Sequence, residues 1–371
     1  MELARAPTVS RVVARLTEGI DTPLLVIILA LSMLGFAALF SAVYESPARV
    51  LNQLVSLSLA LVAMWIVAQI PPQTLMRFAV PAYVIGVLLL VLVALFGDIV
   101  NGARRWLNVG VARFQPSEMM KIALPLMLAW YFHRRESSLR LSDFALAAVL
   151  LAIPFGLIVR QPDLGTASLV GAAGFYVIFF AGLSWRVMGG LGVLGVVALF
   201  PLWGMLHDYQ RRRVLTLLDP TSDPLGAGYH IIQSTIAIGS GGIRGKGWLN
   251  GTQAHLEFIP ERHTDFIFAV YSEEFGLIGN LILLVLYAML IGRGLMIAAN
   301  AATVFARLIA GAMTLMFFTY AFVNMGMVSG ILPVVGVPLP FLSYGGTALL
   351  TLFIGAGILM SVQRHRKLVQ T

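Results

Sequence analysis

Residues 24–43, LLVIILALSMLGFAALFSAV, form an uncharged apolar run that is long enough to cross a lipid bilayer. A helix of about 20 apolar residues spans a hydrocarbon core roughly 30 Å thick. Nine more stretches repeat this pattern, the last three with polar interruptions or flanks: 51–70, 78–97, 166–183, 187–206, 308–328, 346–362, 117–132, 144–160 and 266–291. Because hydrocarbon offers backbone groups no hydrogen-bond partner, each stretch is expected to be helical. The sequence predicts an all-α integral membrane protein of about ten transmembrane helices, with residues 1–371 as one polytopic domain.

The composition favours the bilayer as the solvent for this chain. Hydrophobic residues make up 59% of its 371 residues and charged residues only 11%, whereas about 25% are charged in an average soluble domain. The absence of cysteine excludes disulfides, a thiolate nucleophile and a Cys-ligated metal, and the six histidines have no close metal-ligand spacing. The net charge of +8 fits basic loops beside anionic lipid, so we expect no nucleic-acid partner.

The distribution of Lys and Arg predicts the orientation, because short loops rich in these residues stay in the cytoplasm. With the N-terminus inside, 13 of the 25 Lys and Arg residues are cytoplasmic, and ten spans return the C-terminus to that side. This N-in, C-in arrangement makes residues 1–20 a cytoplasmic tail and places a large loop, 207–265, outside between the seventh and eighth spans. Residues 329–345, with three prolines and several glycines, are expected to form an outer re-entrant loop. The glycines from 189 to 195 are expected to allow close helix packing.

Charged side chains at a membrane are costly, so those outside the cytoplasmic loops are candidates for function. One group lies in GARRWLNVGVARFQPSEMMK (102–121), which contains Arg104, Arg105, Arg113, Glu118 and Lys121. Glu118 and Lys121 share one face of a helix that Pro116 can begin. They either neutralise each other within the structure or line a cavity and tune an acid that lies opposite. In RQPDLGT (160–166), Asp163 is expected to cap the following helix.

The 207–265 loop combines basic residues with glycines. Arg211, Arg212 and Arg213 lie beside an amphipathic stretch, and IAIGSGGIRGKGWLNG (236–251) interleaves glycines with Arg244 and Lys246. Because glycine lets backbone N–H groups approach an anion, this segment favours a phosphate-bearing ligand, the alternative being a solvated loop. Lys246 precedes a glycine rather than Ser or Thr, so the segment is not a P-loop.

The stretch EFIPERHTDFIFAVYSEEFG (257–276) places Asp265 just before a strongly apolar helix. Asp265 either caps that helix or acts as a general base that is accessible from outside, with Arg262 and His263 attracting an anionic substrate. Glu273 and Glu274 lie deeper along the same helix, where we expect structural partners. The stretch that joins the last two predicted spans has four uncharged hydrogen-bonding side chains: Asn324, Ser329, Ser343 and Tyr344.

Six motifs together resemble the SEDS family of shape, elongation, division and sporulation proteins, in the family's order and over nearly the whole chain. They are FQPSEMMKIALPL, QPDLGTA, DYQRRRVLTLLDPTSDPLGAGYHIIQS, IAIGSGGIRGKGW, LEFIPERHTDFIFAV and GILPVVGVPLPFLSYGG. The wording FIPERHTDFIFAV and the short N-terminal tail are more similar to the rod-shape branch, which serves cell elongation, than to the division branch.

The resemblance implies a peptidoglycan glycosyltransferase of the bacterial inner membrane. Such an enzyme polymerises lipid II, an undecaprenyl-pyrophosphate disaccharide-pentapeptide, into glycan strands on the periplasmic side. The family's catalytic aspartate matches Asp265, and its Glu/Lys pair matches Glu118 and Lys121. The implied partner is a class B penicillin-binding protein, a transpeptidase, within the elongation machinery.

The implied chemistry needs one base and nearby cations. A carboxylate takes the proton of the acceptor hydroxyl in an inverting displacement, and the pyrophosphate leaves without protonation. Positive charge stabilises the departing oxygens, and a divalent cation, Mg²⁺ or Mn²⁺, is a further candidate. The supporting and substrate-binding candidates are Glu118, Lys121, Arg104, Arg105, Arg113, Arg211, Arg244, Lys246, Arg262, His263 and Ser343. The alternatives are a lipid II flippase, a scaffold that activates the transpeptidase, and a division-specific polymerase.

Overall fold

The computed structural model describes residues 20–43, 46–100, 103–108, 113–205, 211, 215–223, 226–256, 258–259 and 261–366. The predicted cytoplasmic tail, apart from residue 20, lies outside these residues, and so do Arg212 and Arg213 of the predicted outer loop. The backbone of Arg113 is described, but its side chain lies outside the described part of the chain.

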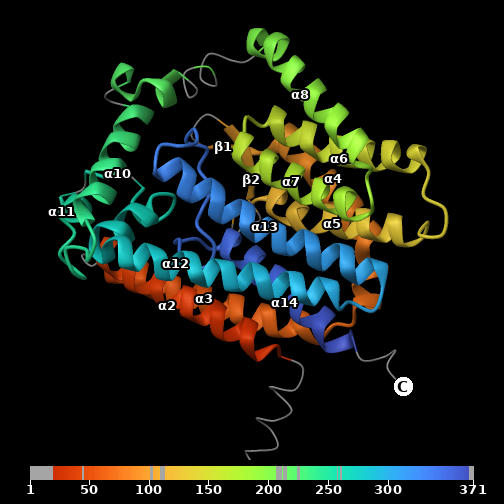
Figure 1. The fold of residues 1–371 in the computed structure, drawn as a ribbon, viewed down its shortest axis with the longest axis horizontal. Coiled ribbons are helices and arrows are strands. Elements are labelled where there is room, and N and C mark those ends of the chain that lie inside the picture. The colour runs from red at the N-terminus through yellow and green to blue at the C-terminus, as the bar shows by residue number, and fades with distance from the viewer. Residues whose placement is uncertain are drawn as a thin grey trace, which may run out of the picture.

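Helices occur at all ten places where the sequence predicts a span (Figure 1). They are α2 (Thr22–Ala42), α3 (Pro47–Gln69), α4 (Pro72–Phe96), α5 (Pro116–His133), α6 (Leu141–Arg160), α7 (Leu164–Phe180), α8 (Trp185–Met205), α12 (Ile267–Ala299), α13 (Val304–Val328) and α14 (Thr347–Arg364). Seven of them, α2, α3, α4, α6, α12, α13 and α14, are long and apolar enough to cross a membrane by length and composition. Large apolar side chains such as Met33 and Phe96, 73% and 75% exposed, point outward, as lipid-facing residues do. The chain is an integral membrane protein.

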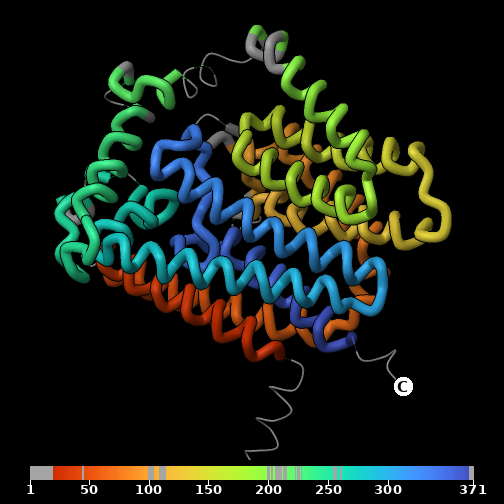
Figure 2. The backbone as a smooth tube through the Cα atoms, viewed as in Figure 1, coloured from red at the N-terminus to blue at the C-terminus, as the bar shows by residue number. Residues whose placement is uncertain are grey.

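The helix α13 lies at the centre of the bundle (Figure 2). It packs against α12 on one side, α5 and α7 on another, and α14, while α2 packs on α12 and α3 on α14. Tyr320 and Phe317 of α13 are fully buried. Because α5 and α14 are also mostly buried, their polar residues must find partners inside the protein.

The glycines of α8 do not pack as predicted. A Cβ atom added at Gly189, Gly190, Gly192 or Gly195 would meet nothing within 4 Å. Leu191, Val193 and their apolar neighbours on this helix are exposed, and Figure 1 shows the end of α8 standing away from the other helices. A glycine-rich apolar stretch allows close approach of a second helix, but it does not ensure that the fold supplies one.

A small antiparallel sheet departs from the all-α prediction. Its strands are β1 (Asp98–Val100), β2 (Ala103–Asn108) and β3 (Arg113–Phe114), in the order β1-β2-β3. Ile99 pairs with Arg104, and Leu107 pairs with Phe114. This segment between α4 and α5 is too polar to continue a span, and pairing its strands satisfies the backbone groups at the end of the bundle.

The predicted 207–265 loop contains η1 (Pro220–Ser222), α10 (Ala227–Gly241) and α11 (Thr252–His255), and α10 packs against α12. Helix α12 is broken at Gly276, where φ is 64° and ψ is −159°. Residues 241–247 fill the break: Lys246 N–H donates to the Glu273 carbonyl (3.0 Å) and Gly247 N–H to the Glu274 carbonyl (3.0 Å), while Leu277 N–H donates to the Gly242 carbonyl (2.9 Å). Two backbone N–H groups of the glycine-rich segment, those of Lys246 and Gly247, are therefore used by α12.

Candidate active site

A cavity of about 570 Å³ lies where β2, α5, α7, α10 and the segments before α12 and α14 meet. The polar side chains of its wall come from six separate parts of the chain: Arg105, Gln115, Glu118, Lys121, Asp163, Thr166, His230, Glu261, Thr264, Asp265, Tyr344 and Thr347. Backbone and apolar groups of residues 334–338 complete the wall. The fold thus gathers Asp265 and the Glu118–Lys121 pair, far apart in the sequence, at one cavity.

Two tertiary hydrogen-bond contacts hold the turn that carries Asp265. The side-chain amide of Asn324 donates to the Asp265 carbonyl (2.8 Å) and to the Val337 carbonyl (2.7 Å). Tyr344 N–H donates to the His263 carbonyl (2.9 Å). The chain between α13 and α14, predicted as a re-entrant loop, is non-helical and forms part of the cavity wall. The two segments together fix the position of Asp265.

Asp265 is partly buried, and its carboxylate has no side-chain hydrogen bond or ion pair among the described residues. It does not cap α12, whose N-cap is Phe266. Burial, with a smaller effect of Glu261, raises the pKa of Asp265 to about 6. Gly336, with φ at +72°, leaves room for it, since a Cβ atom there would stand 3.2 Å from Asp265 Oδ2. A carboxylate with these properties suits proton abstraction near neutral pH.

Glu118 and Lys121 form a buried pair and also line a cavity, whereas their effect on the acid opposite stays a prediction. Lys121 Nζ lies 2.6 Å from Glu118 Oε1, and their side chains are only 2% and 8% exposed. Lys121 also donates to the Tyr320 hydroxyl (2.5 Å). The ion pair is structural, and both residues line the same cavity as Asp265.

Arg105 brings a second cation to this cavity. It donates to the carbonyls of Pro162 (2.6 Å) and Gln161 (3.4 Å), and its Nε lies 3.8 Å from Asp163 Oδ2. Asp163 accepts from Thr166 N–H (3.0 Å) as the N-cap of α7, which confirms the predicted cap. The hydrogen bonds to the 161–162 turn orient the guanidinium beside the cavity.

Six other predicted supporting residues do not line the cavity. Arg262 donates to the Ala42 carbonyl (2.8 Å), Arg211 to the Gly204 carbonyl (2.7 Å) and Arg104 to the Leu95 carbonyl (3.4 Å). The Ser343 hydroxyl accepts from Leu339 N–H (2.7 Å), and His263 packs edge-on against Tyr344. Arg244 is exposed. Their roles in substrate binding stay predictions.

Lys246 has a structural partner. Its Nζ lies 2.7 Å from Glu273 Oε1 and donates to Thr252 (2.8 Å). Glu273 is fully buried and also accepts from Gln253 N–H (3.1 Å). Glu274 is hydrogen-bonded to Ser41. These contacts confirm the structural partners predicted for the two glutamates, and they join the 246–253 segment to α12.

Comparisons with known proteins agree with the family resemblance of the sequence motifs. The cell cycle protein family that includes FtsW, RodA and SpoVE matches residues 21–368. The chain belongs to this family. In Escherichia coli K12, the peptidoglycan glycosyltransferase MrdB is 54% identical over 352 residues, which cover 94% of this chain and 95% of MrdB.

Solved structures resemble this SEDS protein over nearly its whole length. One chain comes from a structure named "Structural coordination of polymerization and crosslinking by a peptidoglycan synthase complex"; it is 37% identical with a TM-score of 0.82, and the match covers 94% of this chain and 99% of that one. RodA of Thermus thermophilus is 32% identical with a TM-score of 0.71, over 94% and 98% of the two chains. The predicted family and its rod-shape branch are confirmed.

Several residues in the wall of this SEDS protein's cavity were missed by sequence reasoning. They are Gln115, Thr166, His230, Glu261, Thr264 and Thr347. His230 lies within the family motif GAGYHIIQS, but nothing in its sequence spacing connects it with Asp265. Only the packing of α10 against α12 brings it to the cavity.

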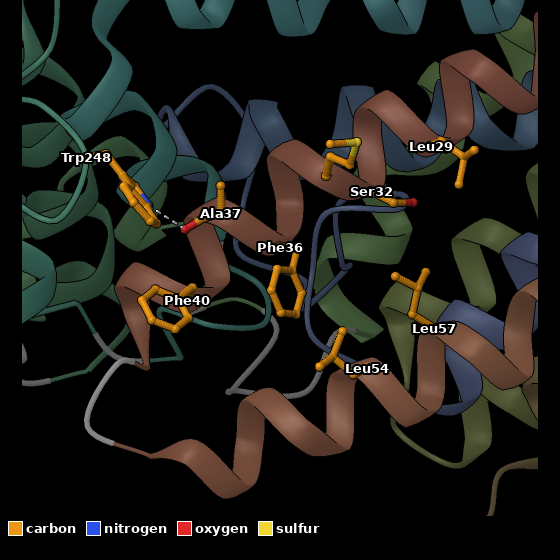
Figure 3. Close-up of a pocket in the computed structure, with 9 residues that line it drawn as sticks. Leu29, Ser32, Phe36, Ala37, Phe40, Leu54, Leu57 and Trp248 are labelled. Carbon is orange, nitrogen blue, oxygen red and sulfur yellow. Dashed lines mark hydrogen bonds between the residues drawn. The ribbon is translucent and has the colours of Figure 1, made fainter.

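Among the apolar grooves on the bundle of this SEDS protein, two lie against helices α2 to α5. One, about 340 Å³, runs between α4, α5 and α14 and shares Glu118 and Thr347 with the Asp265 cavity. The other, about 500 Å³, lies between α2 and α3, where Trp248 donates to the Ala37 carbonyl (2.9 Å) and Phe36, Phe40 and Leu54 form part of the wall (Figure 3). Only the first shares wall residues with the Asp265 cavity.

Proposed function

We propose that this chain joins lipid II units into glycan strands at the outer face of the bacterial inner membrane, with Asp265 as the general base. The chain is a peptidoglycan glycosyltransferase by its family and by its 54% identity to MrdB over nearly the whole chain. The observation that carries the mechanism is a partly buried carboxylate without a side-chain partner among the described residues, in one cavity with Lys121 and Arg105.

In this mechanism Asp265 takes the proton from the acceptor sugar hydroxyl as its oxygen attacks the anomeric carbon of the donor. The bond from that carbon to the pyrophosphate breaks, the configuration inverts, and the undecaprenyl pyrophosphate carries the electron pair away. Lys121 has three N–H donors, of which Glu118 and Tyr320 take two. Its third donor and the guanidinium of Arg105 are suited to the departing oxygens.

The lipid part of the substrate accounts for the apolar groove beside the cavity. The groove between α4, α5 and α14 is lined by Met119, Ile122, Leu126 and other apolar side chains and reaches Glu118. A polyprenyl chain lying there keeps its hydrocarbon out of water while its pyrophosphate enters the polar cavity.

A divalent cation stays a separate proposal. Among the described residues, no three His, Asp or Glu side chains come together as a metal site, so these side chains do not fit a resident ion. Mg²⁺ or Mn²⁺ bound by the pyrophosphate of the substrate is tested by polymerisation in the presence and absence of a chelator.

The proposed topology has ten spans, with both termini in the cytoplasm and the Asp265 cavity open to the periplasm. Since the chain has no cysteine, single cysteines at Leu218, 78% exposed, and at the exposed Ser138 are clean reporters. In intact cells without an outer membrane barrier, a membrane-impermeant thiol reagent should label the first and spare the second. The reverse pattern would invert the orientation and place the cavity inside.

The proposed partner is a class B penicillin-binding protein of the elongation machinery. The support is the likeness to a chain from a peptidoglycan synthase complex. After mild detergent extraction, the two proteins should co-purify, and the Asp265→Asn variant should bind as well as the wild type. If the partner stays behind while the extracted chain still polymerises lipid II, the proposed complex is wrong.

The experiment for the activity uses purified protein and labelled lipid II. The wild type should form long glycan strands, Asp265→Asn should form none, and Glu136→Gln should match the wild type, because Glu136 lies beside His133 at the other end of α5. Polymerisation by the Asp265 variant would remove the assigned base. Transfer of lipid II across a vesicle without any polymer would favour the flippase.

A further inference from the structure

His230 lies in the wall of the cavity that holds Asp265. It sits in the first turn of α10, and its ring stacks on Phe266 with centroids 5.4 Å apart and planes inclined by 26°. Phe266 is buried and directly follows Asp265. The imidazole is therefore part of the wall beside the general base.

The ring has hydrogen-bonding capacity that the protein does not use. In the part of the chain that the structure describes, neither of its nitrogens is hydrogen-bonded, and Nδ1 is buried without a partner. Most buried polar atoms in proteins have a partner, and a bound molecule is one common reason for an exception. A ring in this condition, in the wall of a substrate cavity, points to a contact with a ligand.

The charge state of His230 restricts which part of the substrate it can meet. Burial lowers the pKa of His230 below its usual 6.5, against the smaller opposing effects of Glu261 and Asp223. The imidazole is therefore neutral at neutral pH, with one N–H donor and one acceptor nitrogen. A neutral ring is a weak partner for pyrophosphate and a good one for hydroxyl or amide groups.

The cations of the cavity lie in one part of it. Lys121 and Arg105 come from α5 and β2, where they lie beside the carboxylates of Glu118 and Asp163, whereas Asp265 and Glu261 come from the turn before α12, next to His230. Carboxylates repel a pyrophosphate, so the phosphate end of the donor belongs at the cationic part. The part with Asp265 and His230 is left for the uncharged acceptor sugar.

We infer that His230 binds the acceptor sugar by a hydrogen bond to one of its hydroxyl or N-acetyl groups. This contact presents the attacking hydroxyl of that sugar to Asp265. This inference rests on the proposed glycosyltransferase function. It adds a substrate-binding residue from α10 to a site otherwise built from β2, α5, α7 and the segments before α12 and α14.

Two substitutions separate binding from mere packing. His230→Phe keeps the stack on Phe266 and removes both nitrogens, whereas His230→Gln keeps a donor and an acceptor and removes the ring. If His230 binds the sugar, the Phe variant should raise the KM for lipid II about tenfold, and the Gln variant should stay within about threefold of the wild type. His133→Gln, at the far end of α5, is the matched control and should change nothing.

The opposite order of the two variants would overturn the inference, since a positioning role through Phe266 needs the ring and not its nitrogens. Equal activity of the Phe variant and the wild type would overturn it as well. Thermal unfolding in detergent checks that both variants fold. The proposed function is judged separately: if the wild type itself makes no glycan, that function fails, whereas a polymerising wild type with an unaffected Phe variant defeats only the role of His230.

Discussion

Replacing Lys121 by methionine is the most informative test of the buried ion pair. The side chains of Lys121 and Glu118 are 2% and 8% exposed and lie 2.6 Å apart, and Glu118 Oε2 already has no hydrogen-bond partner. Without the ammonium, Glu118 becomes an uncompensated buried charge, which costs about 3–5 kcal/mol. We expect Lys121→Met to lower the free energy of unfolding by this amount, and Glu118→Gln to have a similar effect.

The double variant, Lys121→Met with Glu118→Gln, should be far less destabilised than the sum of the two single changes. Both charges are then absent, and replacing a buried pair by uncharged groups of similar size is often neutral. Unfolding by sodium dodecyl sulfate in mixed micelles, followed by circular dichroism, measures all four corners of this cycle. A coupling near zero would refute the buried pair.

Polymerisation by the double variant separates structure from chemistry. We expect a folded protein with little activity, because the ammonium that faces the departing pyrophosphate is missing. If the double variant regains the activity of the wild type together with its stability, Lys121 is a structural residue only. Of the two cations in the described cavity wall, only Arg105 would then stabilise the departing pyrophosphate.

Three further predictions follow from the same geometry. Gly336→Ala should lower single-turnover polymerisation several-fold, because its Cβ would stand 3.2 Å from Asp265 Oδ2 at a backbone φ of +72°; unchanged turnover would show that Asp265 tolerates displacement. Wild-type activity should fall as the pH drops through about 6, where Asp265 takes up its proton. Glu261→Gln removes a charge that raises this pKa, so the acid limb of the rate profile should move to lower pH; a limb moved upward would contradict the assignment. Tyr320→Phe removes a hydrogen bond to a buried ammonium and should cost about 1.5–3 kcal/mol in the same micelle titration; equal stability would mean that Lys121 finds another acceptor.

The sequence by itself determined the features that depend on neighbours along the chain. Long apolar runs predicted the places of ten of the described helices, because a backbone in hydrocarbon must satisfy its own hydrogen bonds. Asp163 capping α7 and Lys121 paired with Glu118 are contacts over three residues, which helix geometry brings together. The proposal of Asp265 as the general base rests on the resemblance, since a carboxylate before a helix has the same local pattern as a cap.

Only the tertiary structure decided which distant segments meet. The break in α12 is filled by residues 241–247, and Gly242, Lys246 and Gly247 form backbone hydrogen bonds to the helix there. A Cβ atom added at Gly189, Gly190, Gly192 or Gly195 of α8 would meet no described atom of another part of the chain within 4 Å. Asn324 holds the Asp265 turn, and α10 carries His230 to the cavity. Contacts of this kind depend on how whole helices pack against one another. The spacing of residues along a single helix does not predict this packing.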